Sequence, residues 1–351
     1  MDDNSSNLQP ITSSLPEPDE LEFFKSIYDL IQQARRSVEK SINTAMTVTY
    51  YEIGRRIIEK EQQGEKRAQY GKRILQDLSD YLAKNLGKGF SAENLRLMRK
   101  FFLIYTSDEI SKSAIWKFNP NISWTHYIQL MRISNLDERR FYELEIANNG
   151  WTVKEFQRQF DTSLYERLAL SRDKEKVREL AEKGQIIESP QDIFRDPYVL
   201  EFTGLPEKSS YSENQLRQKL IDHMQQFLIE LGKGFGFMGR QVRFTFEEES
   251  FYVDLVMYNR LLRCFVLIDL KIGRLKHADI GQMQTYVNYY DRKVKLPDEN
   301  QTIGIVLCKD KKDALVEMML PEANNQIFAK RYQTVLPSKE QLKKELEIAE
   351  E

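Results

Sequence analysis

Apolar and polar positions follow a helical period along the first half of the chain. Apolar side chains recur at intervals of three and four residues near its start, at Leu21, Phe24, Ile27, Leu30 and Ile31. The run from Ser37 to Glu61 continues in the same style, and shorter helical segments follow over 92–105, 123–132 and 137–148. Residues 20–167 therefore predict a helical N-terminal domain.

The turns between these helices allow two interpretations. Gly87-Lys88-Gly89-Phe90-Ser91 breaks the helical pattern, and Ser91 is a suitable N-cap for the next helix. Short helices separated by glycine-containing turns are typical of helix-turn-helix or winged-helix modules, which bind DNA. They also occur in any small helical bundle, and the pattern alone favours that second interpretation. Both interpretations stay open here.

Periodicity is weak between residues 168 and 211. This stretch carries a charged run from Arg172 to Lys183 and three prolines, Pro190, Pro197 and Pro206. We therefore expect the connection between two domains here.

From Ser212 the pattern alternates between helices and strands. A helix is predicted from Ser212 to Leu231, ended by Gly232 and Gly234. The elements that follow are strands at 237–246, 250–258 and 262–272, a helix at 278–291, a strand at 302–308, a short helix near Ala314, a strand at 327–332 and a charged helix after Pro337. This order predicts an α/β domain over 212–345, in which a hairpin sheet joins a parallel strand through a crossover helix.

Two of the predicted strands carry ionisable residues where apolar ones are expected. Asp254 interrupts one, and Asp269 and Lys271 lie two apart in the next, so they point to the same face. If the turn between the strands is centred on Arg260 and Leu261, Asp254 lies opposite Leu267 and diagonal to Asp269. Diagonal neighbours are about 7–8 Å apart, close enough for two carboxylates to share a metal ion.

A buried salt bridge between Lys271 and one of the aspartates is the plain alternative, because buried charges are costly unless paired or metal-bound. Further polar residues weaken this alternative. Gln282 and Tyr286 share one face of the crossover helix. Glu213 begins the first helix of the domain, where the helix dipole also favours a solvated carboxylate.

Composition is that of a soluble two-domain protein, with 351 residues, 41% hydrophobic and 30% charged, and a net charge of −2. No apolar run reaches the roughly 20 residues of a membrane span. Residues 1–19 are acidic and polar, unlike a secretory signal, and are expected to be a disordered tail. Cys264 and Cys308 lie in apolar runs, so free thiols in a reducing cytoplasm are expected.

The order of Asp254, Asp269-Leu270-Lys271 and Gln282-x-x-x-Tyr286 resembles that of PD-(D/E)XK nucleases. The amino-acid sequences of many segments are similar to those of one bacterial family in particular, the YhcG type. Examples are Phe235-Gly236-Phe237-Met238-Gly239, Tyr51-Glu52-Ile53-Gly54 and Ser123-Trp124-Thr125-His126-Tyr127. The resemblance covers nearly the whole chain beyond the acidic tail. Position 269 is Asp where that family usually has Glu, although the superfamily pattern allows either.

The resemblance implies a restriction-endonuclease-like C-terminal domain and a set of roles. Asp254 and Asp269 would bind Mg²⁺ (Mn²⁺ also being accepted), together with the carbonyl of Leu270 and a further contact from Glu213. Lys271 would position or deprotonate the attacking water, and Gln282 would orient the water or a phosphate. Tyr286 is expected to serve packing more than chemistry.

The leading hypothesis is therefore a cytoplasmic endonuclease that hydrolyses DNA. A catalytically inactive nuclease-fold protein that binds DNA is the alternative, and a helix-turn-helix regulator is a third. Arg96, Arg99 and Lys100 would contact DNA phosphates, unless neighbouring carboxylates such as Glu59 and Glu61 balance them on a solvated surface. DNA is the expected partner and a membrane is not, while a homodimer stays open.

Overall fold

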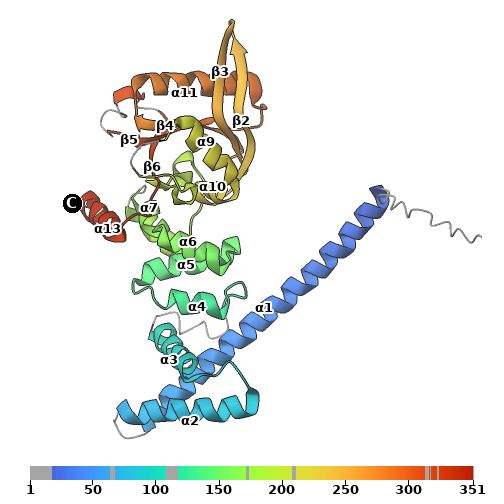
Figure 1. The fold of residues 1–351 in the computed structure, drawn as a ribbon, viewed down its shortest axis with the longest axis vertical. Helices are drawn as coiled ribbons and strands as arrows, with labels where there is room; N and C mark the ends of the chain where they lie inside the picture. The colour runs from blue at the N-terminus through green and yellow to red at the C-terminus, as the bar shows by residue number, and fades with distance from the viewer. Residues whose placement is uncertain are drawn as a thin grey trace, which may run out of the picture. The chain divides into compact units, whose positions relative to one another are not determined.

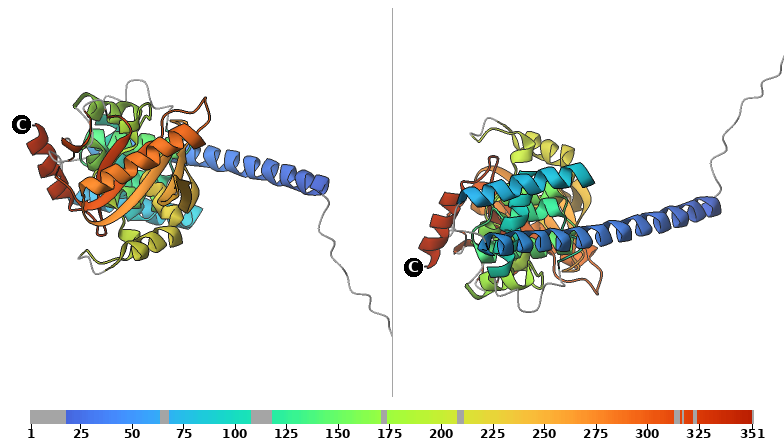
Figure 2. Two further views of the ribbon diagram at one scale, coloured as in Figure 1. Left: turned by 90° about the horizontal axis from the view of Figure 1, so that it is seen from above. Right: turned by 90° about the horizontal axis from the view of Figure 1, so that it is seen from below.

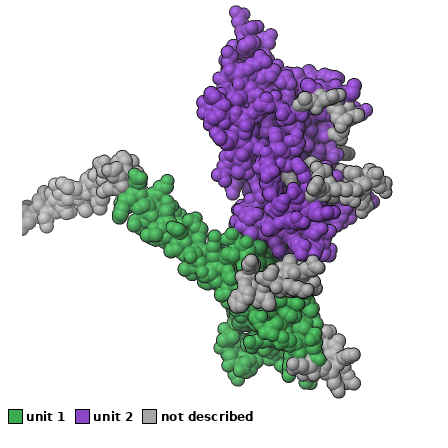
Figure 3. Space-filling view, turned by 180° about the vertical axis from the view of Figure 1, so that it is seen from behind, with its two compact units in different colours: residues 1–131 green, residues 132–351 purple. Residues whose placement is uncertain are grey.

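The chain divides into two compact units, residues 1–131 and 132–351 (Figure 3). The computed structural model describes residues 18–63, 68–107, 118–170, 174–207, 211–312, 316, 318–321 and 324–350 (Figure 1). Within these ranges, no helix has the length and apolar character needed to cross a membrane.

The first unit consists of helices and contains no strand among its described residues. Its elements are α1 (Pro18–Gln63), α2 (Ala68–Leu86), α3 (Ala92–Ser107) and α4 (Trp124–Leu130). Helices α1 and α3 cross closely at Gly54, where an added Cβ atom would lie 2.1 Å from the carbonyl oxygen of Met98. The expected helix start at Ser91 is present, because the Ser91 hydroxyl accepts the Asn94 N–H at 3.2 Å.

The second unit begins with helices that the sequence placed in the N-terminal domain. These are α5 (Leu136–Asn149), α6 (Val153–Asp161) and α7 (Leu164–Ala169). Residues 168–211, where a connection was expected, contribute α8 (Lys174–Lys183), a turn of 3-10 helix at Pro190–Ile193, strand β1 (Tyr198–Val199) and a second such turn at Glu201–Thr203. The division into compact units thus falls between Met131 and Arg132.

A six-stranded mixed sheet forms the centre of the second unit, in the order β1-β6-β5-β4-β3-β2. The strands after β1 are β2 (Phe235–Phe246), β3 (Glu249–Asn259), β4 (Cys264–Arg274), β5 (Ile303–Asp310) and β6 (Ile327–Gln333). Strands β2, β3 and β4 pair antiparallel, whereas β4, β5, β6 and β1 pair parallel. The predicted hairpin sheet with a crossover to a parallel strand is confirmed.

Helices cover both faces of this sheet. Leu216 of α9 (Glu213–Asp222) and Phe227 of α10 (Met224–Leu231) pack in one core with Leu270 of β4. Met283 of α11 (His277–Tyr289) packs in the other core with Leu267. The charged C-terminal helix is α13 (Lys339–Glu350).

Two details differ from the predicted elements or fall outside them. The predicted single helix 212–231 is wrong, because His223 has non-helical backbone angles (φ −117°, ψ 37°) and separates α9 from α10. The predicted short helix near Ala314 lies outside the described residues.

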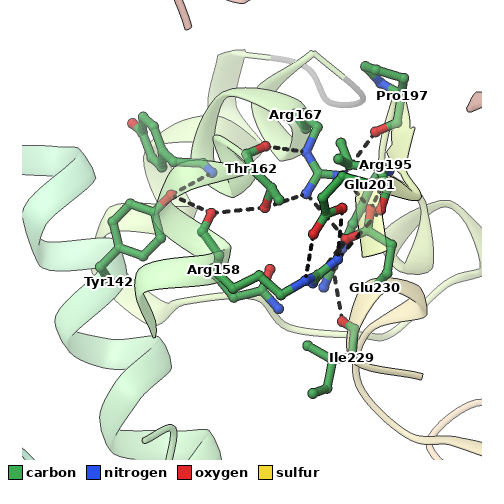
Figure 4. Close-up of polar contacts among 12 residues, drawn as sticks. Tyr142, Arg158, Thr162, Arg167, Arg195, Pro197, Glu201, Ile229 and Glu230 are labelled. Carbon is green, nitrogen blue, oxygen red and sulfur yellow. Dashed lines mark hydrogen bonds and ion pairs between the residues drawn. The ribbon is translucent and has the colours of Figure 1, made fainter. Parts of the chain in front are cut away.

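An ion cluster around the fully buried Glu230 ties α6 and α7 to α10 (Figure 4). The carboxylate of Glu230 accepts Arg167 Nη1 at 2.5 Å and the N–H of Val199 at 2.8 Å. Arg195 and Arg158 approach the same carboxylate at 3.5 and 3.6 Å. Burial opposes ionisation of Glu230, but the three guanidinium charges outweigh it and lower the pKa of this carboxyl. Residues distant in sequence therefore depend on one buried charge.

We expect Glu230→Gln to destabilise the second unit by about 3–5 kcal/mol, because it leaves buried guanidinium charges without their counter-ion. Denaturant unfolding followed by circular dichroism measures the change. Asp298→Asn is the matched control, since it breaks the exposed Arg263–Asp298 pair and should cost no more than about 1 kcal/mol. Equal losses in the two variants would contradict a special role for the cluster.

Candidate active site

Asp254 of β3 is held by three neighbouring elements. Its side chain is buried, and Oδ2 accepts the backbone N–H of Leu270 in β4 at 2.9 Å. Its Oδ1 accepts Gln241 Nε2 of β2 at 2.7 Å and lies 2.6 Å from Arg217 Nη2 of α9. These contacts fix the carboxylate in one orientation at the junction of two strands and a helix.

The strand register differs from the sequence expectation by two residues. Val256 pairs with Leu267 and Leu255 pairs with Ile268, so the expectation that Asp254 lies opposite Leu267 is wrong. The turn has four residues, 260–263, because Asn259 pairs with Cys264 and its side chain accepts the N–H groups of Leu261 and Leu262. One further step in this register leads from Leu255 and Ile268 to Asp254 and Asp269.

Asp269 is buried beside charges of both signs. Its Oδ2 lies 2.8 Å from Lys271 Nζ. Burial raises the pKa of Asp269 to about 6, and the negative charges of Asp254 and Asp279 add to this effect while Lys271 opposes it. Ionisation of Asp269 is therefore disfavoured even with a lysine in contact.

Lys271 is half-buried and lies among several carboxylates. Burial alone would lower its pKa, but the contact with Asp269 and the charges of Glu213 and Asp279 outweigh burial and raise the pKa. Asp279 Oδ1 lies 4.0 Å from Lys271 Nζ, and Asp279 Oδ2 accepts the N–H of Lys276 at the start of α11. Lys271 is therefore protonated at neutral pH.

Gln282 and Tyr286 of α11 form a hydrogen-bonded chain. Gln282 Nε2 donates to the hydroxyl of Tyr286, which donates to the carbonyl of Tyr252 at 2.9 Å. Tyr286 is buried in the core beneath the sheet. The hydrogen bond of Gln282 is thus made to Tyr286.

Glu213 is half-buried and is the first residue of α9. Ser212 caps this helix. The charge of Glu213 acts on Lys271, so α9 brings it toward the site. Arg217 follows it by one helical turn. That spacing was a usable signal for Arg217, which the sequence reasoning missed together with Gln241 and Asp279. Gln241 gave no such local signal, because its contact with Asp254 depends on the pairing of β2 with β3.

The chemistry of this site suits a divalent cation bound by oxygen atoms. Among the described residues of this site, the four carboxylates of Asp254, Asp269, Asp279 and Glu213 outnumber the cationic side chains of Lys271 and Arg217 that interact with them. The excess negative charge and the raised pKa of Asp269 are conditions that a cation would relieve. Within the described ranges no three Asp, Glu, His or Cys side chains gather as a ligand group. Asp254 and Asp269 would therefore be joined by other oxygen donors, and Mg²⁺ commonly keeps water ligands.

Basic side chains of α3 in the first unit are largely matched by carboxylates. Arg99 Nε lies 2.7 Å from Glu61 of α1, and Arg96 Nη1 lies 2.8 Å from Glu93. Lys100 is exposed. Contact of these three side chains with DNA stays a prediction.

The fold is that of the PD-(D/E)XK nuclease class, and Asp254, Asp269 and Lys271 lie on its neighbouring strands β3 and β4. Residues 191–347 match the family model of the YhcG PDDEXK nuclease domain, and residues 26–167 match that of the DUF1016 N-terminal domain. A protein named "Putative nuclease YhcG", from Escherichia coli (strain K12), is 38% identical over 345 residues, which cover 91% of this chain and 92% of that protein. The chain belongs to the YhcG family of PD-(D/E)XK nucleases, and the resemblance seen in the sequence is confirmed.

Two solved structures are also similar in part. A repair endonuclease from Pyrococcus abyssi matches with a TM-score of 0.24 and 15% identity over 37% of this chain, and the EndoMS–dsDNA2 complex with 0.25 and 13% over 38%. The match spans about half the length of each of these two chains, 50% and 51%.

We expect Asp269 to make stability depend on pH. Its pKa is raised in the folded chain to about 6, so its contribution is fully present below about pH 4 and is lost as pH rises through about 6. The loss is about 3 kcal/mol at most, from a shift of about two pKa units. Asp269→Asn should lack this loss, so its stability relative to the native chain should increase from pH 4 to 7. Urea unfolding with EDTA present tests this, and parallel pH profiles would contradict the raised pKa.

Proposed function

We propose that the second unit hydrolyses phosphodiester bonds in DNA as a Mg²⁺-dependent endonuclease, with Mn²⁺ also accepted. Membership of a nuclease family supports the reaction class. The observation that carries the proposal is the meeting of Asp254, Asp269 and Lys271 in a buried site with excess negative charge.

Asp254 and Asp269 would hold the cation, with the carbonyl of Leu270 as a further oxygen donor. The bound cation would supply positive charge to the phosphate and to the attacking water. Gln241 and the Leu270 N–H hold Asp254 in place, so this ligand needs little reorganisation. Glu213 would contact the cation through water, and Gln282 would orient the attacking water or a phosphate oxygen.

Lys271 would act as a charged donor. Its raised pKa keeps the ammonium group protonated at neutral pH. An ammonium group donates hydrogen bonds and stabilises the charge that develops on the phosphate oxygens as the bond from phosphorus to the leaving oxygen breaks. Deprotonation of water by Lys271 would require a neutral amine, which this environment disfavours.

Arg217 would be a second phosphate contact. Arg217 Nη2 lies 2.6 Å from Asp254 Oδ1. Arg217 Nη1 donates to Asn214 Oδ1 at 2.7 Å. A guanidinium can pair with either a carboxylate or a phosphate. When a cation binds Asp254, Arg217 would be available to the substrate.

We also propose that the helical first unit recognises DNA or a protein partner. Lys100 is exposed and Arg96 is half-exposed on one helix, α3. Because Arg96 and Arg99 already pair with carboxylates, any DNA contact from this helix would be weak and sensitive to salt.

We expect Asp254→Ala and Lys271→Ala each to reduce DNA cleavage by on the order of a thousandfold or more, because each removes several kcal/mol of transition-state stabilisation. Cleavage of linear, circular and branched DNA with Mg²⁺ or EDTA is the measurement, and circular dichroism checks folding. Cleavage that survives in either variant, or in EDTA, would end this assignment.

Position 269 gives an internal control for the same experiment. Asp269→Glu keeps a charged oxygen donor and should keep activity, whereas Asp269→Asn should lose it. An active Asn variant would show that Asp269 serves only to pair with Lys271.

We expect the double change Arg96→Glu and Lys100→Glu to weaken DNA binding by the full chain and to make it less dependent on salt. Fluorescence anisotropy with duplex DNA at several salt concentrations, without divalent cations, measures both. The double change Arg178→Glu and Lys183→Glu is a control, since it places the same change of charge at two exposed positions of α8 in the second unit. Unchanged affinity in the α3 double variant would assign the first unit to protein recognition.

A further inference from the structure

The N-terminal half of α1 presents a broad apolar face. α1 is one continuous helix of 46 residues (Figure 2), about 69 Å long at 1.5 Å per residue. Eight large apolar side chains between residues 23 and 42 are between 41% and 62% exposed: Phe23, Phe24, Ile27, Tyr28, Leu30, Ile31, Val38 and Ile42. At 100° per residue they fall on one side of the helix, and Phe24, Ile31 and Val38 follow a seven-residue repeat.

This face is too large to be an ordinary solvent-exposed surface. A large side chain has on the order of 150–200 Å² of surface to bury. Eight side chains that are about half exposed therefore offer roughly 600–800 Å². A standard protein interface buries about 800 Å² on each partner, whereas the largest apolar patch of a monomer is usually about 300–600 Å².

The same unit contains an apolar groove that fits such a helix. The groove has a volume of about 460 Å³ and lies between the C-terminal half of α1 and α2. Its walls are apolar, formed by Ile53, Ile57, Leu78, Leu82, Leu86 and Phe90. Arg56 and Lys60, both exposed, lie along its rim.

Charges at the start of α1 and at the rim of the groove favour one orientation of a second α1 helix that occupies the groove. The start of α1 carries Asp19, Glu20 and Glu22, whereas the groove about 50 Å further along carries Arg56 and Lys60. An antiparallel pair of α1 helices brings each acidic end to the basic rim of the other copy and each Phe23-Phe24 pair to the groove. A parallel pair would place like charges together and leave both grooves without an apolar partner.

The polar side of this half-helix favours a protein over a lipid surface. Between Glu22 and Lys40 the helix carries four basic and three acidic residues, of which all but Arg35 lie on the polar side: Lys25, Arg35, Arg36 and Lys40 with Glu22, Asp29 and Glu39. Helices that lie on anionic membranes are rich in Lys and Arg on the polar side. A nearly balanced side allows two identical helices to approach without repulsion.

We propose that this chain forms a homodimer in which the N-terminal half of α1 lies antiparallel along α1 of a second copy and enters its α1–α2 groove. The interface is isologous, because the same two patches of each copy contact one another. The nuclease site takes no part in it.

The oligomeric state tests the proposal. Light scattering and sedimentation velocity on the full chain should give twice the chain mass. The double change Phe24→Glu and Ile31→Glu, and separately Leu86→Glu in the groove, should raise the dissociation constant by roughly a hundredfold or more. These residues are exposed, so circular dichroism should show retained helix. Gln33→Glu, which adds the same charge on the opposite side of α1, should leave the dimer intact.

Orientation is tested by charge exchange and cross-linking. Arg56→Glu with Lys60→Glu should weaken the dimer, and adding Glu20→Lys with Glu22→Lys should restore it. Copies carrying Phe23→Cys should form a disulfide with copies carrying Lys60→Cys and not with one another, because Phe23 lies on the apolar face and Lys60 on the groove rim. A native chain that stays monomeric at tens of micromolar, with or without binding to anionic vesicles, would overturn the proposal. So would a dimer that survives Phe24→Glu with Ile31→Glu, or a disulfide between two Phe23→Cys copies.

Discussion

The buried carboxylate of Glu230 determines how the second unit is assembled. Arg167 of α7, Arg158 of α6 and Arg195 all contact it, and the N–H of Val199 donates to it. A lone ion in this interior would cost several kcal/mol, so the guanidiniums and Glu230 each need the other. The cluster joins the two family-model segments, because Arg158 and Arg167 belong to residues 26–167 while Glu230 belongs to residues 191–347.

The anchored α10 in turn supports the site. α9 precedes α10 with a break at His223, and α9 carries Glu213 and Arg217. Gly232 follows α10 with a left-handed backbone (φ 106°), and a Cβ atom there would lie 3.1 Å from Arg195 Nη2. The chain can therefore enter β2 past the buried guanidinium only with a glycine at this position. The cluster and the site share these elements, although no residue of the cluster contacts Asp254.

Local patterns in the sequence were enough to predict the strands and the charged residues on the two strands of the candidate site. Alternating or continuous apolar runs located β2 to β6, and Asp254, Asp269 and Lys271 were visible as charges inside such runs. Features that depend on tertiary contacts could not be predicted from local patterns. The register depends on Asn259 capping a four-residue turn. The packing of α6 and α7 against α10 depends on Arg158 and Arg167 reaching Glu230, more than 60 residues further on. The hydrogen bond from Gln282 to Tyr286 could have been predicted from their helical spacing. The sequence did not show that this bond occupies the Gln282 amide, to which a catalytic role had been given.

The salt bridge considered as the plain alternative exists, since Lys271 lies 2.8 Å from Asp269. A purely structural pair of this kind should lower the pKa of its carboxyl. Here the pKa is raised, because burial and the neighbouring carboxylates outweigh the lysine. Stability alone would be served better by an apolar residue at position 254 or 269, as buried ion pairs seldom improve on well-packed apolar side chains. The three buried carboxylates of Asp254, Asp269 and Asp279 outnumber the cationic side chains of Lys271 and Arg217 that contact them, which costs stability, and the proposed binding of a divalent cation would account for that cost.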